Sequence, residues 1–208
     1  MQSETEPHSP TALKILGIAG QLFMQRGYHA VSINDIVRAA GITKPTLYYH
    51  FPDKEELFVQ TTIHMLAEVH RAFEVAAAEA PDLAGQLMGM ARVLLDPSSG
   101  DMRMLRHEMH EHMPAAQQQR LGVAFWEHMI APVRQVMQGG LERGELAPRP
   151  DLALAMLFLG MIESFYQFSP QMSRAILPAE PGEAPNAAFT AEALVDLFLH
   201  GVSRRAHS

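Results

Sequence analysis

Lysine, hydroxyl and aromatic side chains are concentrated in one short stretch, residues 44–50, which reads Lys-Pro-Thr-Leu-Tyr-Tyr-His. In a helix, Leu47 and Phe51 lie one turn apart and would anchor the stretch inward, so the other groups point elsewhere. Those groups are Lys44, Thr46, Tyr48, Tyr49 and His50. Cations, hydroxyls and aromatic rings on the N-terminal half of a helix contact phosphates and base edges. The stretch therefore predicts a helix that binds DNA.

A phosphate site is expected just after this stretch. Asp53 can cap the next helix, which places Lys54 in its first turn. The first backbone N–H groups of a helix have no intrahelical partner, and together with a nearby cation they attract anions.

A second cluster with possible chemistry is the string His-Glu-Met-His-Glu-His at residues 107–112. In a helix, His107, His110 and Glu111 lie on one polar face, and His107 and Glu111 at i, i+4 could hold zinc or nickel with a third ligand. The string is not His-Glu-x-x-His, so it does not match the zinc-protease arrangement. A solvated polar face is the simpler interpretation.

Local signals indicate the helices that would position these groups. Residues 11–26 are expected to form the first helix, and Gly27 stands where a left-handed C-terminal residue is common. Ser32 and Asp35 can form a capping box for a helix at residues 33–40, with Val31 and Ile36 as its hydrophobic staple. Gly41 supplies a turn and Thr43 caps the helix at residues 44–50, where Pro45 is tolerated in the first turn.

The remaining chain also has helical periodicity, and the predicted fold is all-α. We expect helices at residues 54–80, 82–95, 101–113, 115–139 with a bend at Pro132, 151–168 and 190–205. Four prolines indicate a loop near residues 169–188. The domains expected are an arm at 1–10 that is disordered, a helix-turn-helix domain at 11–57, and a helical regulatory and dimerisation domain at 58–208.

Residues 13–57 resemble the DNA-binding domain of the tetracycline-repressor (TetR) family. The residues that carry this resemblance are Phe23, Gly27, Ser32, Ile36, Ala40, Gly41, Leu47, Tyr48, Phe51, Lys54 and Leu57. The resemblance implies that Tyr48 binds phosphate, with Lys44, Pro45, Thr46, Tyr49 and His50 facing the major groove. It further implies that Ser32 and Lys54 contact the DNA backbone and that Asn34 reaches a base. Pro45 occupies a position where many members have glycine. The resemblance therefore implies how the helix docks on DNA, but not which base sequence it reads.

The resemblance also implies a small-molecule site among the later helices, which are rich in methionine. Methionine alone favours ordinary core packing, although thioethers also line adaptable pockets. Glu163 lies in an otherwise apolar segment and needs a polar partner, and His112 falls on an apolar helix face. The candidate ligand-binding residues are Met109, His112, Met113, Phe125, Trp126, Met129, Phe158, Glu163, Phe165 and Tyr166.

Composition excludes several alternatives. Residues 11–54 carry five basic and two acidic side chains, a local balance of +3, although the chain's net charge is −7. A basic module on an acidic body suits local contact with phosphate. There is no cysteine, no long apolar run and no signal-peptide pattern, so we expect a cytoplasmic protein without a membrane span. No nucleotide-loop or nucleophile-elbow motif occurs, so no enzyme and no cofactor are predicted.

The sequence thus predicts a homodimeric regulator of transcription that binds double-stranded palindromic DNA. A repressor released by a small hydrophobic or amphipathic effector is the main hypothesis. Apolar residues on the helices at 151–168 and 190–205 would pair with their symmetry copies as a four-helix interface, as in the family. Ordinary core packing is the alternative explanation of these apolar faces. The alternative function is a metal-responsive regulator that senses through His107, His110 and Glu111.

Overall fold

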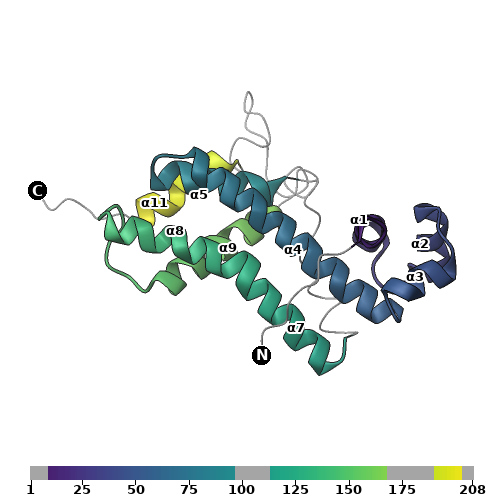
Figure 1. The fold of residues 1–208 in the computed structure, drawn as a ribbon. Helices are drawn as coiled ribbons and strands as arrows, with labels where there is room; N and C mark the ends of the chain where they lie inside the picture. Colours follow the sequence, from purple (N-terminus) through teal and green to yellow (C-terminus); the bar gives the residue numbers. More distant parts are fainter. Residues whose placement is uncertain (1–8, 97–112, 168–189, 203–208) are drawn as a thin grey trace, which may run out of the picture. The chain divides into compact units, whose positions relative to one another are not determined.

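A computed structural model describes residues 9–96, 113–167 and 190–202. All the regular elements in these ranges are helices, which confirms the predicted all-α class. They are α1 (Pro10–Arg26), α2 (Ile33–Ala40), α3 (Lys44–His50), α4 (Lys54–Glu79), α5 (Leu83–Leu95), α7 (Ala115–Phe125), the π-helical turn η2 (Trp126–Ile130), α8 (Ala131–Glu142), α9 (Asp151–Gln167) and α11 (Ala191–Val202) (Figure 1). None of the described helices is long and apolar enough to cross a membrane.

The chain divides into two compact units, and α4 contributes residues to both. Unit 1 comprises residues 1–68 and 100–125, and unit 2 comprises residues 69–99 and 126–208. The sequence-based division after residue 57 differs, because α7 and the first half of α4 group with the helix-turn-helix.

The core of unit 1 is built around α1 and the first turns of α4 (Figure 1). Phe23 meets Phe58 edge to face at 5.2 Å between ring centroids, and Tyr28 lies 5.0 Å from the same Phe58 ring. Met113 and Leu121 join this core from the segment around α7. The helix-turn-helix therefore shares one hydrophobic core with a later part of the chain.

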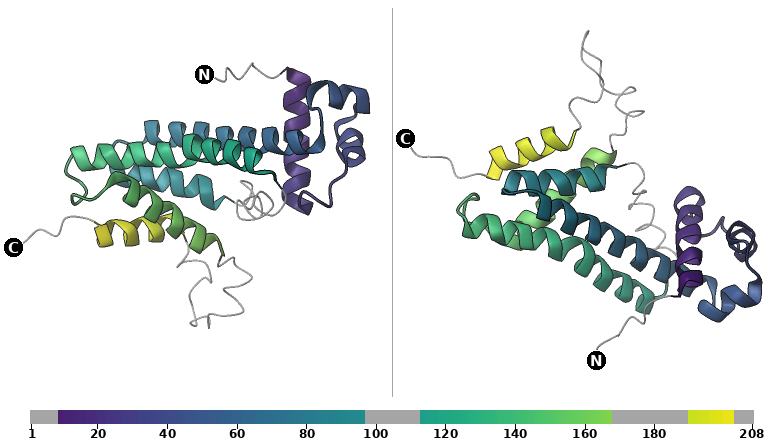
Figure 2. Two further views of the ribbon diagram at one scale, coloured as in Figure 1. Left: turned by 90° about the horizontal axis from the view of Figure 1, so that it is seen from below. Right: turned by 45° about the horizontal axis from the view of Figure 1, so that its top comes forward.

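Unit 2 is a bundle in which α11 packs beside α5 and α9, and α8 packs beside α9 and α5 (Figure 2). Phe158 of α9 and Phe198 of α11 are fully buried and meet edge to face at 5.3 Å. Arg92 of α5 and Glu192 of α11 form an ion pair at its surface.

A π-helical turn interrupts the helix that was expected to bend at Pro132. The ring of a helical proline meets the carbonyl four residues earlier and provides no N–H, so the preceding turn must adjust. Here the adjustment is η2, which ends at Ile130, two residues before Pro132. The helix continues to Glu142, and Gly144 closes the following turn at φ 71°.

Several predicted elements lie outside the described residues. They are most of the helix at 101–113, the loop at 169–188, most of the arm at 1–10 and the last residues of the final helix. Pro10, which was assigned to the arm, is the first residue of α1. Ser9 caps this helix, because the Ser9 hydroxyl accepts a hydrogen bond from the Ala12 N–H at 3.2 Å.

Candidate nucleic-acid interface and effector cavity

Two capped helices and a glycine turn form the helix-turn-helix. The Ser32 hydroxyl accepts from the Asp35 N–H at 3.2 Å, and the Asp35 carboxylate accepts from the Ser32 N–H at 3.0 Å, which completes the capping box. The Ser32 hydroxyl also donates to the Asp35 carboxylate, and this hydrogen bond, followed by the one from the Ser32 N–H, lowers the pKa of Asp35. Gly41 adopts the left-handed conformation at φ 63°, and the Thr43 hydroxyl caps α3 through the Thr46 N–H.

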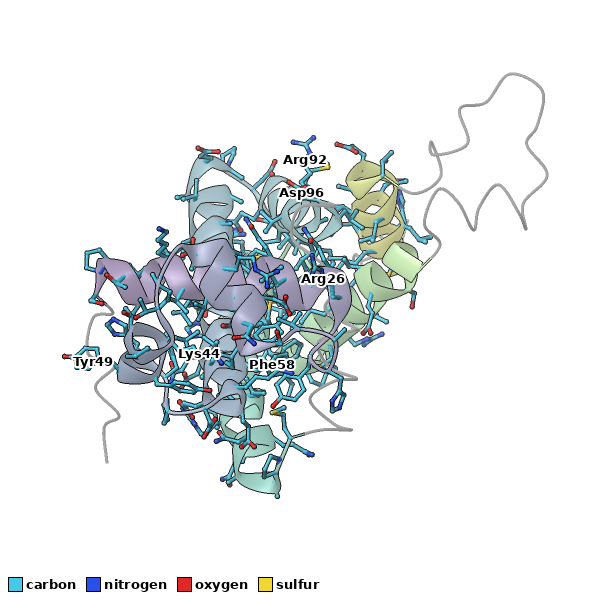
Figure 3. All side chains as sticks on the ribbon, turned by 90° about the vertical axis from the view of Figure 1, so that its right-hand side faces the viewer. Arg26, Lys44, Tyr49, Phe58, Arg92 and Asp96 are labelled. Atoms are coloured by element: carbon cyan, nitrogen blue, oxygen red, sulfur yellow. The ribbon has the colours of Figure 1, made fainter. Side chains whose placement is uncertain are left out.

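Leu47 anchors α3 to the core of unit 1, because its side chain is buried whereas the rest of the helix faces solvent. Truncating a fully buried leucine typically costs about 2–5 kcal/mol, so Leu47 fixes where the rest of α3 points. Tyr49 is 84% exposed and projects away from the ribbon, and Tyr48 is 47% exposed (Figure 3). Lys44 and Pro45 are also exposed, whereas Thr46 and His50 are half-buried.

Some predicted contact residues already have partners within the chain. The Ser32 hydroxyl donates to Asp35 Oδ2, and the Thr46 hydroxyl shares a 2.8 Å hydrogen bond with that of Thr43. The Ser32 hydroxyl can donate to a phosphate only if its proton turns away from Asp35, because a hydroxyl has one proton to donate. In the Thr43–Thr46 pair one of the two hydroxyls keeps its proton for a phosphate or a base edge. Asn34 is exposed on α2.

Lys54 is held against an aromatic ring that sequence reasoning did not identify. Its Nζ lies 4.2 Å from the ring centroid of Tyr28, within cation–π range. Partial burial raises the pKa of Tyr28, and Glu55 and Asp53 add to the effect. Asp53 caps α4 as expected, because its carboxylate accepts from the Glu56 N–H at 2.7 Å.

Arg38 is a further candidate that the sequence reasoning missed. Its side chain is 81% exposed, and its guanidinium is 4.0 Å from Asp35. It follows Asn34 by four residues on α2, so the i, i+4 spacing of two exposed polar groups could have indicated it.

A two-point ion pair joins α7 to α4 inside unit 1. The Arg120 guanidinium donates to both Glu56 oxygens, at 2.6 and 2.9 Å, and Gln60 donates to the same carboxylate at 2.8 Å. The hydrogen bond from Arg120 is the main cause of the lowered pKa of Glu56. Glu56 lies two residues after Lys54, so this pair fixes the start of α4.

Unit 2 contains a cavity of about 340 Å³ between α4, α5 and α8. Phe73, Met90, Pro132 and Val136 give it apolar walls, and its polar lining is His70, Glu74, Gln86, Gln135 and Arg143. Of the ten predicted ligand-binding residues, the six whose side chains the structure describes are not in its lining.

The six described residues of that set are dispersed in the structure. Met113 is buried in the core of unit 1, and Met129 and Phe158 are buried in unit 2. Phe125 and Glu163 are half-buried, and Trp126 is 40% exposed. Met109, His112 and the side chains of Phe165 and Tyr166 lie outside what the structure describes.

Two histidines that are 58 residues apart meet beside the cavity. Nδ1 of His70 on α4 and Nδ1 of His128 in η2 are 3.1 Å apart. Burial lowers the pKa of His128, and the nearby His70 contributes to the effect. Within the described ranges, no set of three or more His, Cys, Asp or Glu side chains is placed to hold a metal. The predicted metal candidates His107, His110 and Glu111 fall outside those ranges.

A capped helix-turn-helix with an exposed basic and aromatic helix, carried on an all-α body, defines a helix-turn-helix transcriptional regulator. Residues 15–61 match the family model described as "Bacterial regulatory proteins, tetR family". QacR, a transcriptional regulator of Staphylococcus aureus, is 47% identical over 47 residues, which are 23% of this chain and 25% of QacR. KstR2, a transcriptional repressor of Rhodococcus jostii, is 26% identical over 75% of this chain and 78% of its own.

Solved structures share the fold over nearly the whole chain. Reduced NemR of Escherichia coli has a TM-score of 0.74 with 18% identity, over 94% of this chain and 99% of that one. A tetR-family structure from Mesorhizobium loti has a TM-score of 0.66 with 24% identity, over 95% and 100%. Residues 15–61 thus form a domain of the TetR family of transcriptional regulators, a family that is not enzymatic, as the sequence predicted.

Proposed function

We propose that this protein is a repressor that binds a palindromic operator as a homodimer and is released by a small hydrophobic or amphipathic effector. The observation that carries the proposal is the exposed face of α3, which is capped by Thr43 and seated by Leu47. The word "repressor" in the name of KstR2 supports repression rather than activation. The proposal includes a cytoplasmic location, because bacterial transcription takes place in the cytoplasm.

The proposed DNA contacts divide by chemistry. Tyr48, Lys54 and Ser32 bind phosphates, which position the protein without reading the sequence. The side chains of Lys44, Thr46, Tyr49 and His50, with Pro45, face the major groove, and Asn34 reaches a base from α2. Arg38 joins the phosphate contacts because it is the one cation of α2 and its side chain is 81% exposed.

Dimerisation is proposed through an apolar stripe on α9. Leu152, Met156 and Leu157 are exposed large apolar side chains, and Ala153 and Gly160 lie between them on the same face. By contrast, Ile162 of α9 and Leu194 and Phe198 of α11 are buried within the protomer, so core packing accounts for that part of the predicted four-helix interface. Leu197 of α11 is 57% exposed and is a further candidate for this interface. One recognition helix contacts few base pairs, and a two-fold symmetric dimer doubles the number of base pairs that are contacted.

The cavity of unit 2 supports the effector part of the proposal. A volume of about 340 Å³ with mixed walls suits a small amphipathic molecule. Such a molecule releases DNA only if it binds better to a shape in which the two recognition helices lose their spacing of about 34–36 Å.

The test is selection of bound sequences from a random duplex library by the purified full-length protein at physiological salt. Recovery of one palindromic site is expected, and the site then serves as the probe for effector release. Recovery of a single half-site would overturn the dimeric part. A folded protein that enriches no sequence, with or without added divalent metal, would overturn the operator-binding proposal.

A further inference from the structure

His70 and His128 form the least expected polar contact in unit 2. Helix α4 provides one imidazole and the π-helical turn η2 provides the other, and their Nδ1 atoms are 3.1 Å apart with ring centroids at 5.4 Å. Both rings are half-buried. Single π turns inside longer helices occur frequently at functional sites.

Glu74 places an acidic group near the second nitrogen of His70. Its carboxylate Oε1 is 3.8 Å from Nε2 of His70, one helical turn away on α4. A proton on Nε2 is stabilised by this carboxylate, which leaves the Nδ1 lone pair facing His128. Histidines that ligate metals commonly have this arrangement, in which one nitrogen binds the ion and the other donates toward a carboxylate.

The separation of the two nitrogens fits a shared cation. With bonds of about 2.0–2.1 Å, two nitrogens on one metal ion are about 2.9 Å apart at right angles and about 3.4 Å apart in a tetrahedron. The observed 3.1 Å lies between these values. We propose that Nδ1 of His70 and Nδ1 of His128 together bind a divalent transition-metal ion such as Zn²⁺, Ni²⁺ or Cu²⁺.

The two imidazoles leave the remaining coordination positions to water or to donor atoms of a small molecule. His70 also lines the cavity between α4, α5 and α8, so the cavity provides both an entry path and room for those ligands. Glu74 and Glu127, the acidic neighbours of the pair, favour a cation there. The bound ion would connect α4 directly to η2. This inference goes beyond the proposed function and does not depend on DNA binding.

The experiment uses the full chain with His107, His110 and His112 replaced by alanine, so that the predicted cluster at residues 107–112 cannot contribute. Calorimetric titration with Zn²⁺ and with Ni²⁺ should show one ion bound per chain. His70→Asn and His128→Asn should each weaken binding about 100-fold or more, and Glu74→Gln about tenfold, which is the range for partners of a metal ligand. His200→Asn, an exposed histidine elsewhere in unit 2, should leave the affinity unchanged.

Electron paramagnetic resonance of bound Cu²⁺ provides a second measurement that does not require a variant at the site. Coupling to two imidazole nitrogens in the background chain supports the proposal. No bound ion in that chain, coupling to fewer than two nitrogens, or unchanged affinity in folded His70→Asn and His128→Asn would overturn it. The pair would then be a direct imidazole–imidazole hydrogen bond.

Discussion

Tyr48 and Lys44 lie on the exposed side of α3, and we expect their replacement to affect DNA binding in different ways. Tyr48→Phe removes one hydroxyl, and a hydrogen bond to a charged phosphate contributes about 1.5–3 kcal/mol. We expect affinity to fall at least roughly tenfold for the selected site and for a scrambled duplex alike. Lys44→Ala should instead change the ranking of sequences. Fluorescence anisotropy with both duplexes measures this, and an unchanged affinity of Tyr48→Phe would show that Tyr48 does not bind phosphate.

Thr61 and Thr62 are adjacent buried threonines of α4 with opposite hydrogen-bonding states. Thr61 is 2% exposed, and its hydroxyl has no hydrogen-bond partner among the described residues, whereas the Thr62 hydroxyl donates to the Phe58 carbonyl at 2.9 Å. An unsatisfied buried hydroxyl costs about 1–3 kcal/mol, so Thr61→Val should raise the free energy of unfolding by about 1 kcal/mol or more. Thr62→Val is the matched control and should not stabilise. Urea denaturation measures the free energy of unfolding of both variants, and equal effects of the two changes would contradict the prediction.

At the scale of elements, α4 and α5 approach closely because Gly89 has no side chain. A Cβ built on Gly89 would lie 2.7 Å from the Cβ of Ala76. Alanine is preferred to glycine in a helix by about 0.5–1 kcal/mol, but overpacking a core costs about 1–3 kcal/mol. We therefore expect Gly89→Ala to lower the free energy of unfolding.

Gly122→Ala is the matched control, because nothing lies within 4 Å of a Cβ built there in α7. It should stabilise the protein by about 0.5–1 kcal/mol. Thermal unfolding followed by circular dichroism should give melting-temperature shifts of opposite sign. Stabilisation by both changes would show that α4 and α5 separate readily.

The Glu56–Arg120 pair should make the packing of α7 on α4 sensitive to acid. Because the hydrogen bond from Arg120 lowers the folded pKa of Glu56 below its ordinary 4.5, its contribution is complete above pH 4.5. It is lost as the pH falls through the folded value. The difference in unfolding free energy between wild type and Glu56→Gln should therefore be constant from pH 7 to about 4.5 and shrink below it. A difference independent of pH would mean that the ion pair contributes nothing.

Local signals were sufficient to predict the elements of the helix-turn-helix. Helices α2 and α3 begin and end at the predicted residues, because Ser32, Gly41 and Thr43 act through atoms within a few positions of themselves. The turn η2 was not predicted, since Pro132 indicates an interrupted helix without specifying how the backbone adjusts. The cavity and the His70–His128 contact depend on which helices pack together, and periodicity in one helix carries no information about its neighbour.

At the scale of the whole molecule, the exposed apolar stripe of α9 requires an explanation. Leu157 is 50% and Met156 is 49% exposed, and water in contact with such side chains is unfavourable. A second copy of the chain would cover the stripe by two-fold symmetry, so that each α9 packs on the other. Leu157→Glu places a charge in that contact, and a buried unpaired charge costs several kcal/mol.

The Leu157→Glu variant should therefore sediment as a monomer, and the wild-type chain should sediment as a dimer. Val123→Glu is the matched control, because Val123 is a similarly exposed apolar residue on a different helix, α7. It should remain dimeric. Since the two half-sites of a palindrome are read together only by a dimer, Leu157→Glu should also weaken binding to the full site far more than binding to an isolated half-site. A dimeric Leu157→Glu variant that keeps its operator affinity would show that the chain dimerises through another surface.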